Sequence, residues 1–196
     1  MALTPSTMLA LGTSAPDFAL TDTAGQTIAR DNFAGQPLLV MFICNHCPYV
    51  KHVAPELARI GRDYGVASGG RVGIVAIQSN DIEAYPDDAP DKMREEVETR
   101  GYTFPYVLDA DQSVAKAFTA ACTPDFFLFD ADHKLVYRGQ LDGSRPHRIA
   151  SGQYDDRDGQ ANGEDLRAAL DAVLAGEPVP GEQLPSMGCS IKWREG

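Results

Sequence analysis

Two kinds of apolar pattern alternate along this chain. Continuous runs at 38–43 and 72–78 are almost entirely apolar, which is typical of central strands that helices cover on both faces. Between these runs, apolar residues recur at spacings of three and four, which predicts a helix with one buried side. The residues on that side are Val50, Val53, Leu57, Ile60 and Tyr64.

Turn residues and helix-end signals mark the other elements. Pro48 suits the first turn of a helix, where an N–H would lack a partner. Pro105 places the strand at 104–108 at a sheet edge, because proline cannot donate to a ladder. Asn162 is expected to cap the last helix, with Asp165 three residues on. The remaining predicted elements are hairpins at 18–28 and 126–137, a loop at 79–88, a helix between Pro90 and Gly101, a helix at 113–119 and a last helix that ends at Gly176.

Three stretches show neither pattern and are expected to be irregular: 1–17, 142–161 and the tail at 177–196. A length of 196 residues fits one domain, which we take to be 1–196 with that tail included. The alternation of strands and helices predicts an α/β fold with a central sheet flanked by helices on both faces. The late hairpin adds antiparallel strands, so the sheet is expected to be mixed.

Charge narrows the range of partners. The net charge is −11, which argues against nucleic acid, because phosphate binding needs clustered Lys and Arg. The acidic excess is concentrated at 81–98, which we interpret as a solvated helix face rather than a docking surface for a basic partner. No run of about 18 apolar residues exists, so we expect no membrane span. Residues 1–17 lack the features of a secretory signal, so we predict a cytoplasmic protein.

The candidate chemistry lies in Cys44-Asn45-His46-Cys47-Pro48, directly after the first apolar run. Two thiols in C-x-x-C spacing at a strand-to-helix junction indicate a catalytic or metal-binding pair. The free N–H groups and the dipole of a helix N-terminus stabilise a thiolate and lower its pKa. We predict that Cys44, farther out on the turn, attacks a partner disulfide and that Cys47 resolves the mixed disulfide. His46 is expected to favour the thiolate when it is protonated.

A second segment, Cys122-Thr123-Pro124, precedes the predicted late hairpin. With the C-x-x-C it resembles the thioredoxin superfamily, in which a proline at this position follows a cis peptide bond and lies against the C-x-x-C. The resemblance implies that Thr123–Pro124 is that bond. The residues expected to shape the site are Asn45, His46, Pro48, Thr123 and Pro124.

Two further thiols are candidate auxiliaries. The same resemblance implies that Cys122 lies near the first pair, where it could resolve or trap an intermediate; the alternative is a small buried hydrophobe. Cys189 belongs to the tail, which could fold over the site and offer a fourth thiol. The alternative is that Cys189 is a packed cysteine or a free cysteine at the surface.

The closer resemblance is to the redoxin branch, the alkyl hydroperoxide reductase/thiol-specific antioxidant (AhpC/TSA) and TlpA-like proteins, over roughly 12–140. It rests on the hairpin from Phe18, the DNFAGQ-P lead into the first apolar run, and the extra helix before Pro124. It implies a thioredoxin-like fold with an N-terminal β-hairpin and an extra strand and helix insertion. The blocks that resemble one bacterial subfamily are FICNHCPYVKH, AIQSNDIEAYPDDAP, ACTPDFFLFD, YRGQLDGSRP and PSMGCSIKW.

These observations favour a thiol–disulfide oxidoreductase that uses Cys44 and Cys47 to reduce or exchange protein disulfides. Its redox centre would be the Cys44–Cys47 disulfide, with no other cofactor and no metal, and its partners a protein disulfide and a thiol reductant. A peroxidase acting on peroxide is the alternative. In peroxiredoxins both a proline and a Thr or Ser precede the reactive cysteine at fixed spacing, and neither cysteine here has both. The third hypothesis is a module that binds a soft metal, in which both cysteines bind copper or zinc together with His46 or Cys122. The sequence leaves the oligomeric state open between a monomer and a homodimer.

Overall fold

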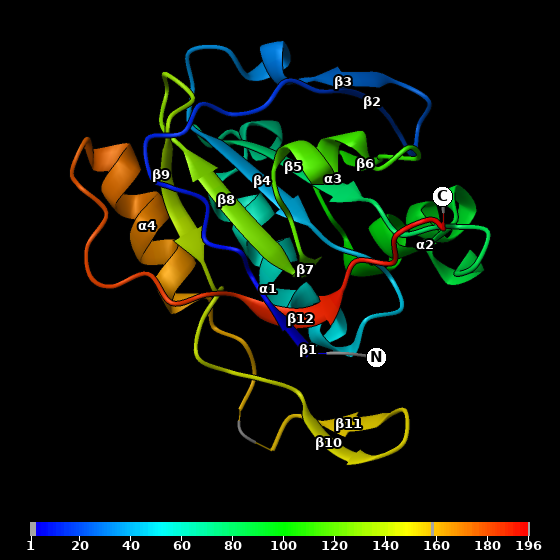
Figure 1. The fold of residues 1–196 in the computed structure, drawn as a ribbon. Coiled ribbons are helices and arrows are strands. Elements are labelled where there is room, and N and C mark those ends of the chain that lie inside the picture. Colours follow the sequence, from blue (N-terminus) through cyan, green and yellow to red (C-terminus); the bar gives the residue numbers. More distant parts are fainter. Residues whose placement is uncertain (1–2, 158, 196) are drawn as a thin grey trace.

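A seven-stranded sheet runs through the computed structural model, which describes residues 3–157 and 159–195 (Figure 1). Its strand order is β3-β2-β6-β5-β4-β8-β9, in which β4, β5 and β6 are parallel and the other neighbours antiparallel. The strands are β2 (Ala19–Asp22), β3 (Thr27–Ala29), β4 (Leu38–Phe42), β5 (Gly73–Gln78), β6 (Tyr106–Leu108), β8 (Asp125–Phe129) and β9 (Leu135–Gly139). The helices are α1 (Pro48–Tyr64), α2 (Pro90–Arg100), α3 (Ser113–Ala117) and α4 (Glu164–Ala175), with 3-10 turns η1 (Arg30–Phe33), η2 (Val66–Ser68) and η3 (Pro86–Asp88). The predicted mixed sheet is confirmed.

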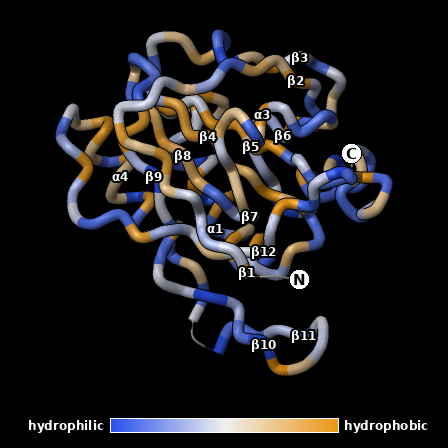
Figure 2. The backbone as a smooth tube through the Cα atoms, in the orientation of Figure 1, coloured by the Kyte–Doolittle hydropathy of each residue, from blue (hydrophilic) through white to orange (hydrophobic). Residues whose placement is uncertain are grey.

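Strand β4 shows why both faces of the sheet are covered. All of its residues are buried, and because side chains alternate along a strand, Leu39 and Met41 face one way and Val40 and Phe42 the other. The first face packs against α1 and α4, and the second against α3. Figure 2 shows hydrophobic residues concentrated along the central strands. Each fully buried large apolar side chain contributes roughly 1.5–3 kcal/mol, so these two layers fix the positions of β4 and α1.

Helix α1 turns its predicted apolar side inward. Val50, Leu57 and Ile60 are buried, whereas Lys51 and Pro55 are exposed. The helix begins at Pro48, a position at which the missing N–H of proline costs no hydrogen bond. None of the helices in the described residues is both long enough and apolar enough to cross a membrane.

The strand at 104–108 is not at an edge, contrary to the sequence prediction. It is shorter, and β6 lies between β2 and β5. Pro105 is tolerated because it stands just before the strand, where its carbonyl accepts a hydrogen bond from Ala76 N–H at 2.9 Å. The N-terminal hairpin then pairs with the free side of β6, so the proline does not terminate the sheet.

Residues 1–17 and the tail at 177–196 are less irregular than predicted. β1 (Leu3–Pro5) pairs with β12 (Met187–Ser190), which pairs in turn with β7 (Cys122–Thr123). Strands of two to four residues are too short to show a hydrophobic period, so the sequence pattern misses them. Figure 1 shows this small sheet lying across the N-terminal end of α1.

The stretch at 142–161 also holds structure that the sequence did not predict. β10 (His147–Ala150) and β11 (Gln153–Asp155) form a hairpin that projects from the body of the molecule (Figure 1). All four residues of β10 are exposed. A strand without a buried face lacks the alternation that would reveal it.

Helix α4 starts without the predicted capping box. Asn162 Oδ1 accepts a hydrogen bond from Glu164 N–H at 3.1 Å, but Asp165 hydrogen-bonds to Gln140 Nε2 instead. The N–H of Asn162 itself donates to Asp142 Oδ2 at 2.7 Å. Backbone N–H groups at the start of α4 therefore find acceptors both in a neighbouring residue, Asn162, and in a distant one, Asp142.

A buried ion pair stands at the start of β8. Arg138 Nη2 lies 3.6 Å from Asp125 Oδ2, and both side chains are fully buried. Burial raises the pKa of Asp125 to about 6, against the opposing charge of Arg138. Removing one partner of such a pair leaves an uncompensated charge in the interior.

Arg138→Met is therefore expected to lower the free energy of unfolding by about 3–5 kcal/mol at pH 8, where Asp125 of the wild type is ionised. The double variant Asp125→Asn, Arg138→Met removes both charges and should recover at least half of that loss. Urea unfolding of the three proteins measures both values. A single variant as stable as the wild type would show that the pair does not compensate Asp125.

Candidate active site

The C-x-x-C segment joins the carboxyl end of β4 to the amino end of α1. Ile43 N–H still donates to Ile77 O of β5 at 3.0 Å, after which the chain leaves the sheet. Cys47 takes the N-cap position of α1. The sequence prediction of a strand–C-x-x-C–helix junction is thus met, and Cys47 lies where backbone N–H groups are free.

Strand β7 brings the second predicted segment to this junction. β8 pairs with β4 so that Asp125 lies opposite Phe42, and the same register continues to place Thr123 beside Cys44. Thr123 Oγ1 lies 3.2 Å from Cys44 Sγ, and Thr123 O accepts a hydrogen bond from the Cys47 thiol at 3.3 Å. The peptide bond that follows Thr123 is cis. One threonine therefore contacts both sulfur atoms.

Cys44, Cys47 and Cys189 lie in one buried cluster, and their thiols influence one another's pKa values. The thiols of Cys189 and Cys44, with backbone N–H groups that include that of Val50, hold the pKa of Cys47 far below its usual value, although burial opposes them. Burial, Cys47 and the charge of Asp88 raise the pKa of Cys44. These directions favour ionisation of Cys47 over that of Cys44, and a Cys47 that ionises gives up its hydrogen bond to Thr123 O.

Both cysteines are buried: the exposed fraction is 2% for Cys44 and 0% for Cys47. The small difference runs in the predicted direction, with Cys44 the farther out of the two. That Cys44 is the attacking residue stays a prediction. The spacing gives the order of the two residues along the chain, but the residues that cover them come from distant segments.

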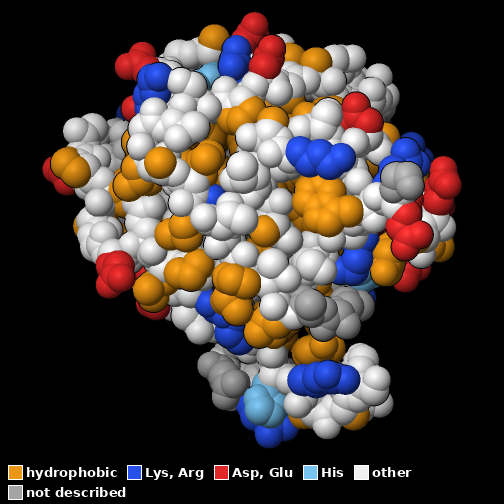
Figure 3. All heavy atoms as spheres, in the orientation of Figure 1, with side chains coloured by type: hydrophobic (Ala, Val, Ile, Leu, Met, Phe, Trp, Pro, Cys, Tyr) orange, Lys and Arg blue, Asp and Glu red, His pale blue; other side chains and the backbone are white. Residues whose placement is uncertain are grey.

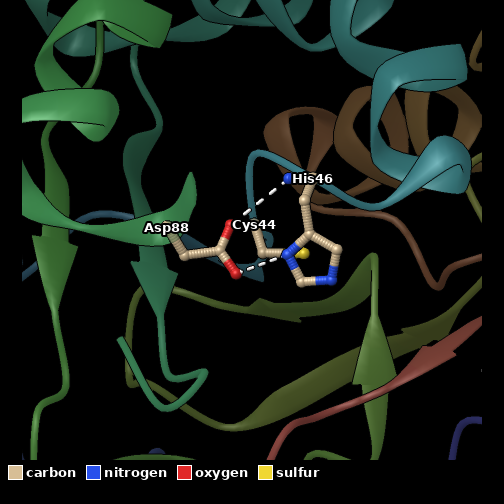
Figure 4. Close-up of side chains that lie close together, drawn as sticks. All are labelled: Cys44, His46 and Asp88. Carbon is tan, nitrogen blue, oxygen red and sulfur yellow. Dashed lines mark hydrogen bonds and ion pairs between the residues drawn. The ribbon is translucent and has the colours of Figure 1, made fainter. Parts of the chain in front are cut away.

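Asp88 is the main residue that the sequence analysis missed. The charge pattern places it on a solvated face, but it is fully buried beside the cysteine pair. Its Oδ1 accepts hydrogen bonds from the N–H groups of Asn45 at 2.8 Å and His46 at 3.3 Å. Its Oδ2 lies 2.6 Å from His46 Nδ1 (Figure 4). The same oxygen accepts a hydrogen bond from Asn80 Nδ2 at 2.8 Å. Burial raises the pKa of Asp88, but these hydrogen bonds together hold it below its ordinary value.

The sequence carries only a weak signal for this carboxylate. Pro86 and Pro90 bracket Asp88, and the chain between them makes the 3-10 turn η3 and then enters α2. Such a turn can point one side chain inward, but nothing local selects which of the acidic residues it is. Apart from Asp88, every carboxylate at 81–98 is exposed or half-buried, as predicted.

Asn45, which the sequence analysis expects to shape the site, ties the same turn to the sheet. Its Nδ2 donates to Asp87 O at 3.0 Å, and its Oδ1 accepts from Tyr106 Oη at 3.1 Å. The two bonds use both ends of the amide. They hold the C-x-x-C loop between η3 and β6.

His46 covers Cys44 on the side of the pair that faces outward. Its ring stacks on Tyr85 with centroids 5.3 Å apart and an interplanar angle of 14°, and Figure 4 shows the sulfur of Cys44 directly behind the imidazole. Its Nε2 is buried and finds no hydrogen-bond partner among the described residues. A substrate that reaches Cys44 must therefore displace or pass this ring.

Cavities flank His46 on two sides. One of about 610 Å³ lies between the start of α1 and the β10–β11 hairpin, and one of about 380 Å³ lies between His46 and the loop that carries Tyr85. The larger is lined by Pro48 and Lys51 and by Arg148 of the hairpin. Figure 3 shows Lys or Arg and His side chains on the projecting hairpin. A substrate segment therefore has room beside the site.

Of the two candidate auxiliary thiols, the structure brings Cys189 to the pair but turns Cys122 away. Cys122 Sγ lies 3.5 Å from Pro124 O, and burial raises its pKa, as does the charge of Asp125. Cys122 thus matches the small buried hydrophobe of the sequence analysis.

A metal ligand set can be drawn from Cys44, His46 and Asp88, whose candidate ligand atoms lie within 4.8 Å of one another. Both oxygens of Asp88 already accept hydrogen bonds, and His46 directs Nδ1 at that carboxylate. A carboxylate is also a hard ligand, unlike the thiolates that select copper and zinc. We therefore assign these residues to a hydrogen-bonded network.

Comparison with known proteins identifies the family of the chain. A model of the AhpC/TSA family covers residues 11–138. The chain belongs to the AhpC/TSA family. Thiol-disulfide oxidoreductase ResA of Geobacillus kaustophilus is 28% identical over 132 residues, 67% of this chain and 70% of that protein.

Two solved structures are similar to this AhpC/TSA-family protein. An uncharacterized conserved protein from Geobacillus kaustophilus has a TM-score of 0.90 and 49% identity, covering 100% of this chain and 98% of that one. The thioredoxin domain of a thiol-disulfide oxidoreductase from Bacteroides vulgatus has a TM-score of 0.55 and 20% identity, covering 66% and 88%. The second likeness shows that the fold is thioredoxin-like, as predicted.

The lowered pKa of Asp88 predicts how stability depends on pH. Because the folded pKa lies below the unfolded value of about 4, the carboxylate stabilises the protein above that pH, and this contribution is lost as the pH falls through the folded pKa. Asp88→Asn should cost about 1–3 kcal/mol at pH 7, because buried donors lose their acceptor. The difference from wild type should shrink between pH 5 and pH 3, as the wild-type carboxylate takes up its proton.

The neighbouring Asp87→Asn is the matched control, since its side chain is exposed and surface changes of this kind stay within about 0.5 kcal/mol. Urea unfolding at several pH values measures both variants. A difference for Asp88→Asn that is the same at every pH would rule out a stabilising role for the charge.

Proposed function

We propose that this protein is a thiol–disulfide oxidoreductase that uses the Cys44–Cys47 dithiol to reduce or exchange protein disulfides. The observation that carries the proposal is the pair of contacts from Thr123 to the two sulfurs, at the N-terminal end of α1. The relative named ResA, a thiol-disulfide oxidoreductase, supports the same reaction class. The redox cofactor is then the cysteine pair itself.

Cys44 is the nucleophile in this proposal. Thr123 O and the thiol of Cys189 block access to Cys47. Cys44 instead lies behind His46, which lines both cavities. A substrate disulfide that enters from that side and shifts His46 meets Cys44 first. The thiolate of Cys47, which ionises more readily than Cys44, takes the proton of Cys44 as the attack begins.

The reaction then runs through two exchanges. Cys44 Sγ bonds to one substrate sulfur, and the substrate S–S bond breaks with its electron pair on the other sulfur, which takes up a proton. Cys47 loses its proton and attacks Cys44 Sγ, which releases the second substrate thiol. The substrate is reduced by two electrons, the pair is oxidised to the Cys44–Cys47 disulfide, and a thiol reductant restores it.

Insulin-disulfide reduction with dithiothreitol as the terminal reductant tests this function. The wild type should accelerate insulin precipitation, and Cys44→Ser should fall to the rate of dithiothreitol alone, because it lacks the attacking sulfur. Cys122→Ser is the matched control, since that buried thiol points away from the pair, and it should retain the wild-type rate.

Equal rates for wild type and Cys44→Ser would remove Cys44 as the nucleophile. A wild type that leaves insulin untouched but consumes hydrogen peroxide with dithiothreitol would replace the proposal with the peroxidase alternative.

A further inference from the structure

The tail strand β12 puts a third thiol on the same face as the active pair. Cys189 lies directly opposite Thr123 in the antiparallel ladder between β12 and β7. Side chains of directly opposed residues point to the same side of a sheet. Thr123 sends its hydroxyl to Cys44, so the thiol of Cys189 faces the amino end of α1 as well.

Cys47 lies between two thiols rather than beside one. All three cysteines belong to one buried cluster. Cys189 stands opposite Thr123, whose carbonyl contacts Cys47 Sγ, and both Cys44 and Cys189 influence the pKa of Cys47, so either could become its partner in a disulfide. The alternation along β7 excludes Cys122 from this group, because Cys122 is one residue from Thr123 and faces the other side.

The position of Cys189 is fixed by contacts on both sides of it. Gly188 packs so closely that a Cβ there would lie 2.0 Å from Thr123 O. Ser186 Oγ donates to Pro124 O at 2.7 Å, and Lys192 N–H donates to Asn80 Oδ1 at 2.8 Å. Asn80 also donates to Asp88, so the tail and the His46–Asp88 pair share one polar network. Cys189 is 4% exposed and is held in place rather than loose on the surface.

We propose that Cys189 is the third member of the redox centre: its thiolate attacks Cys47 Sγ of the Cys44–Cys47 disulfide, which moves the bond to Cys47–Cys189 and frees Cys44. This inference rests on the proposed function, which supplies the first disulfide. No outside oxidant or reductant takes part, because one S–S bond breaks while another forms.

The exchange balances in atoms and electrons. Cys189 gives its proton to the Cys44 sulfur, which leaves with the electron pair of the broken bond and ends as a thiol. Cys47 is oxidised before and after the step. Cys47 is the largest influence that raises the pKa of Cys189. When Cys47 enters a disulfide, it is no longer the anion that holds this proton, so Cys189 ionises more easily.

The relocation changes what a partner protein meets. With the bond at Cys47–Cys189, the oxidised protein presents a reduced Cys44 next to the cavities at His46. The stored disulfide then joins the start of α1 to β12. The oxidised protein can then capture a second substrate as a mixed disulfide at Cys44, a state that a two-cysteine enzyme cannot hold.

Disulfide mapping of Cys44→Ser tests the proposal in the intact chain. After oxidation with one equivalent of diamide and alkylation, trypsin cuts the chain so that Cys47 lies in peptide 31–51, Cys122 in 117–134 and Cys189 in 168–192. The expected product is peptide 31–51 joined to 168–192. Adding Cys189→Ser should abolish that product, and adding Cys122→Ser should leave it unchanged.

The wild type separates this inference from the function on which it rests. A Cys44–Cys47 bond stays within peptide 31–51, whereas the relocated bond joins 31–51 to 168–192 with Cys44 alkylated. Both species are expected together. Wild type that holds only the bond within 31–51, with Cys47 of Cys44→Ser recovered as a thiol or joined to 117–134, would overturn the inference and leave the proposed function standing. A joined product in Cys44→Ser without any bond within 31–51 in the wild type would show that Cys47 pairs with Cys189 directly, and it would overturn both the proposed dithiol and the exchange that starts from its disulfide.

Discussion

The site depends on the contact between one threonine and two sulfur atoms. Thr123 reaches Cys44 through its hydroxyl and Cys47 through its carbonyl, and it can do so only because β8 lies against β4 in the register that sets Asp125 opposite Phe42. Every residue of both strands is buried, so the core holds the two strands together in that register. The chemistry of the cysteine pair is therefore positioned by the hydrophobic core.

A buried polar network completes what the core begins. Asp88 binds the N–H groups that precede α1 and the ring of His46, while Asn80 joins Asp88 to the backbone of the tail. A buried carboxylate is tolerated here because hydrogen bonds satisfy both of its oxygens. Three parts of the chain that are distant in sequence, the C-x-x-C loop, the turn η3 and the tail, thus meet around one charge. The same network holds Cys189 beside Cys47, so the sulfur group and the polar network form one unit.

The sequence predicted the parts of this molecule that have a period or a motif. Strands β4 and β5, helix α1, the mixed sheet, and the meeting of Cys44 and Cys47 with Thr123 follow from apolar runs, C-x-x-C spacing and family resemblance. It could not predict β12 or the β10–β11 hairpin, because short strands and strands exposed on every residue show no hydrophobic alternation. It misplaced Asp88 for a related reason: composition reports charge along the chain, whereas burial depends on which distant groups can donate to that charge. The burial of both cysteines could not be predicted either, since the residues that cover them come from distant segments.

In the proposed function the cysteine pair makes and breaks one sulfur–sulfur bond reversibly. The most direct measurement is a count of free thiols in the unfolded protein after equilibration with glutathione buffers of graded potential. Four cysteines are present, so the account predicts four thiols under reducing conditions and two under oxidising conditions. A single transition should join these states with the slope of a two-electron couple, tenfold in the ratio for about 30 mV. Four thiols at every potential, or a loss that reducing buffer does not reverse, would contradict it.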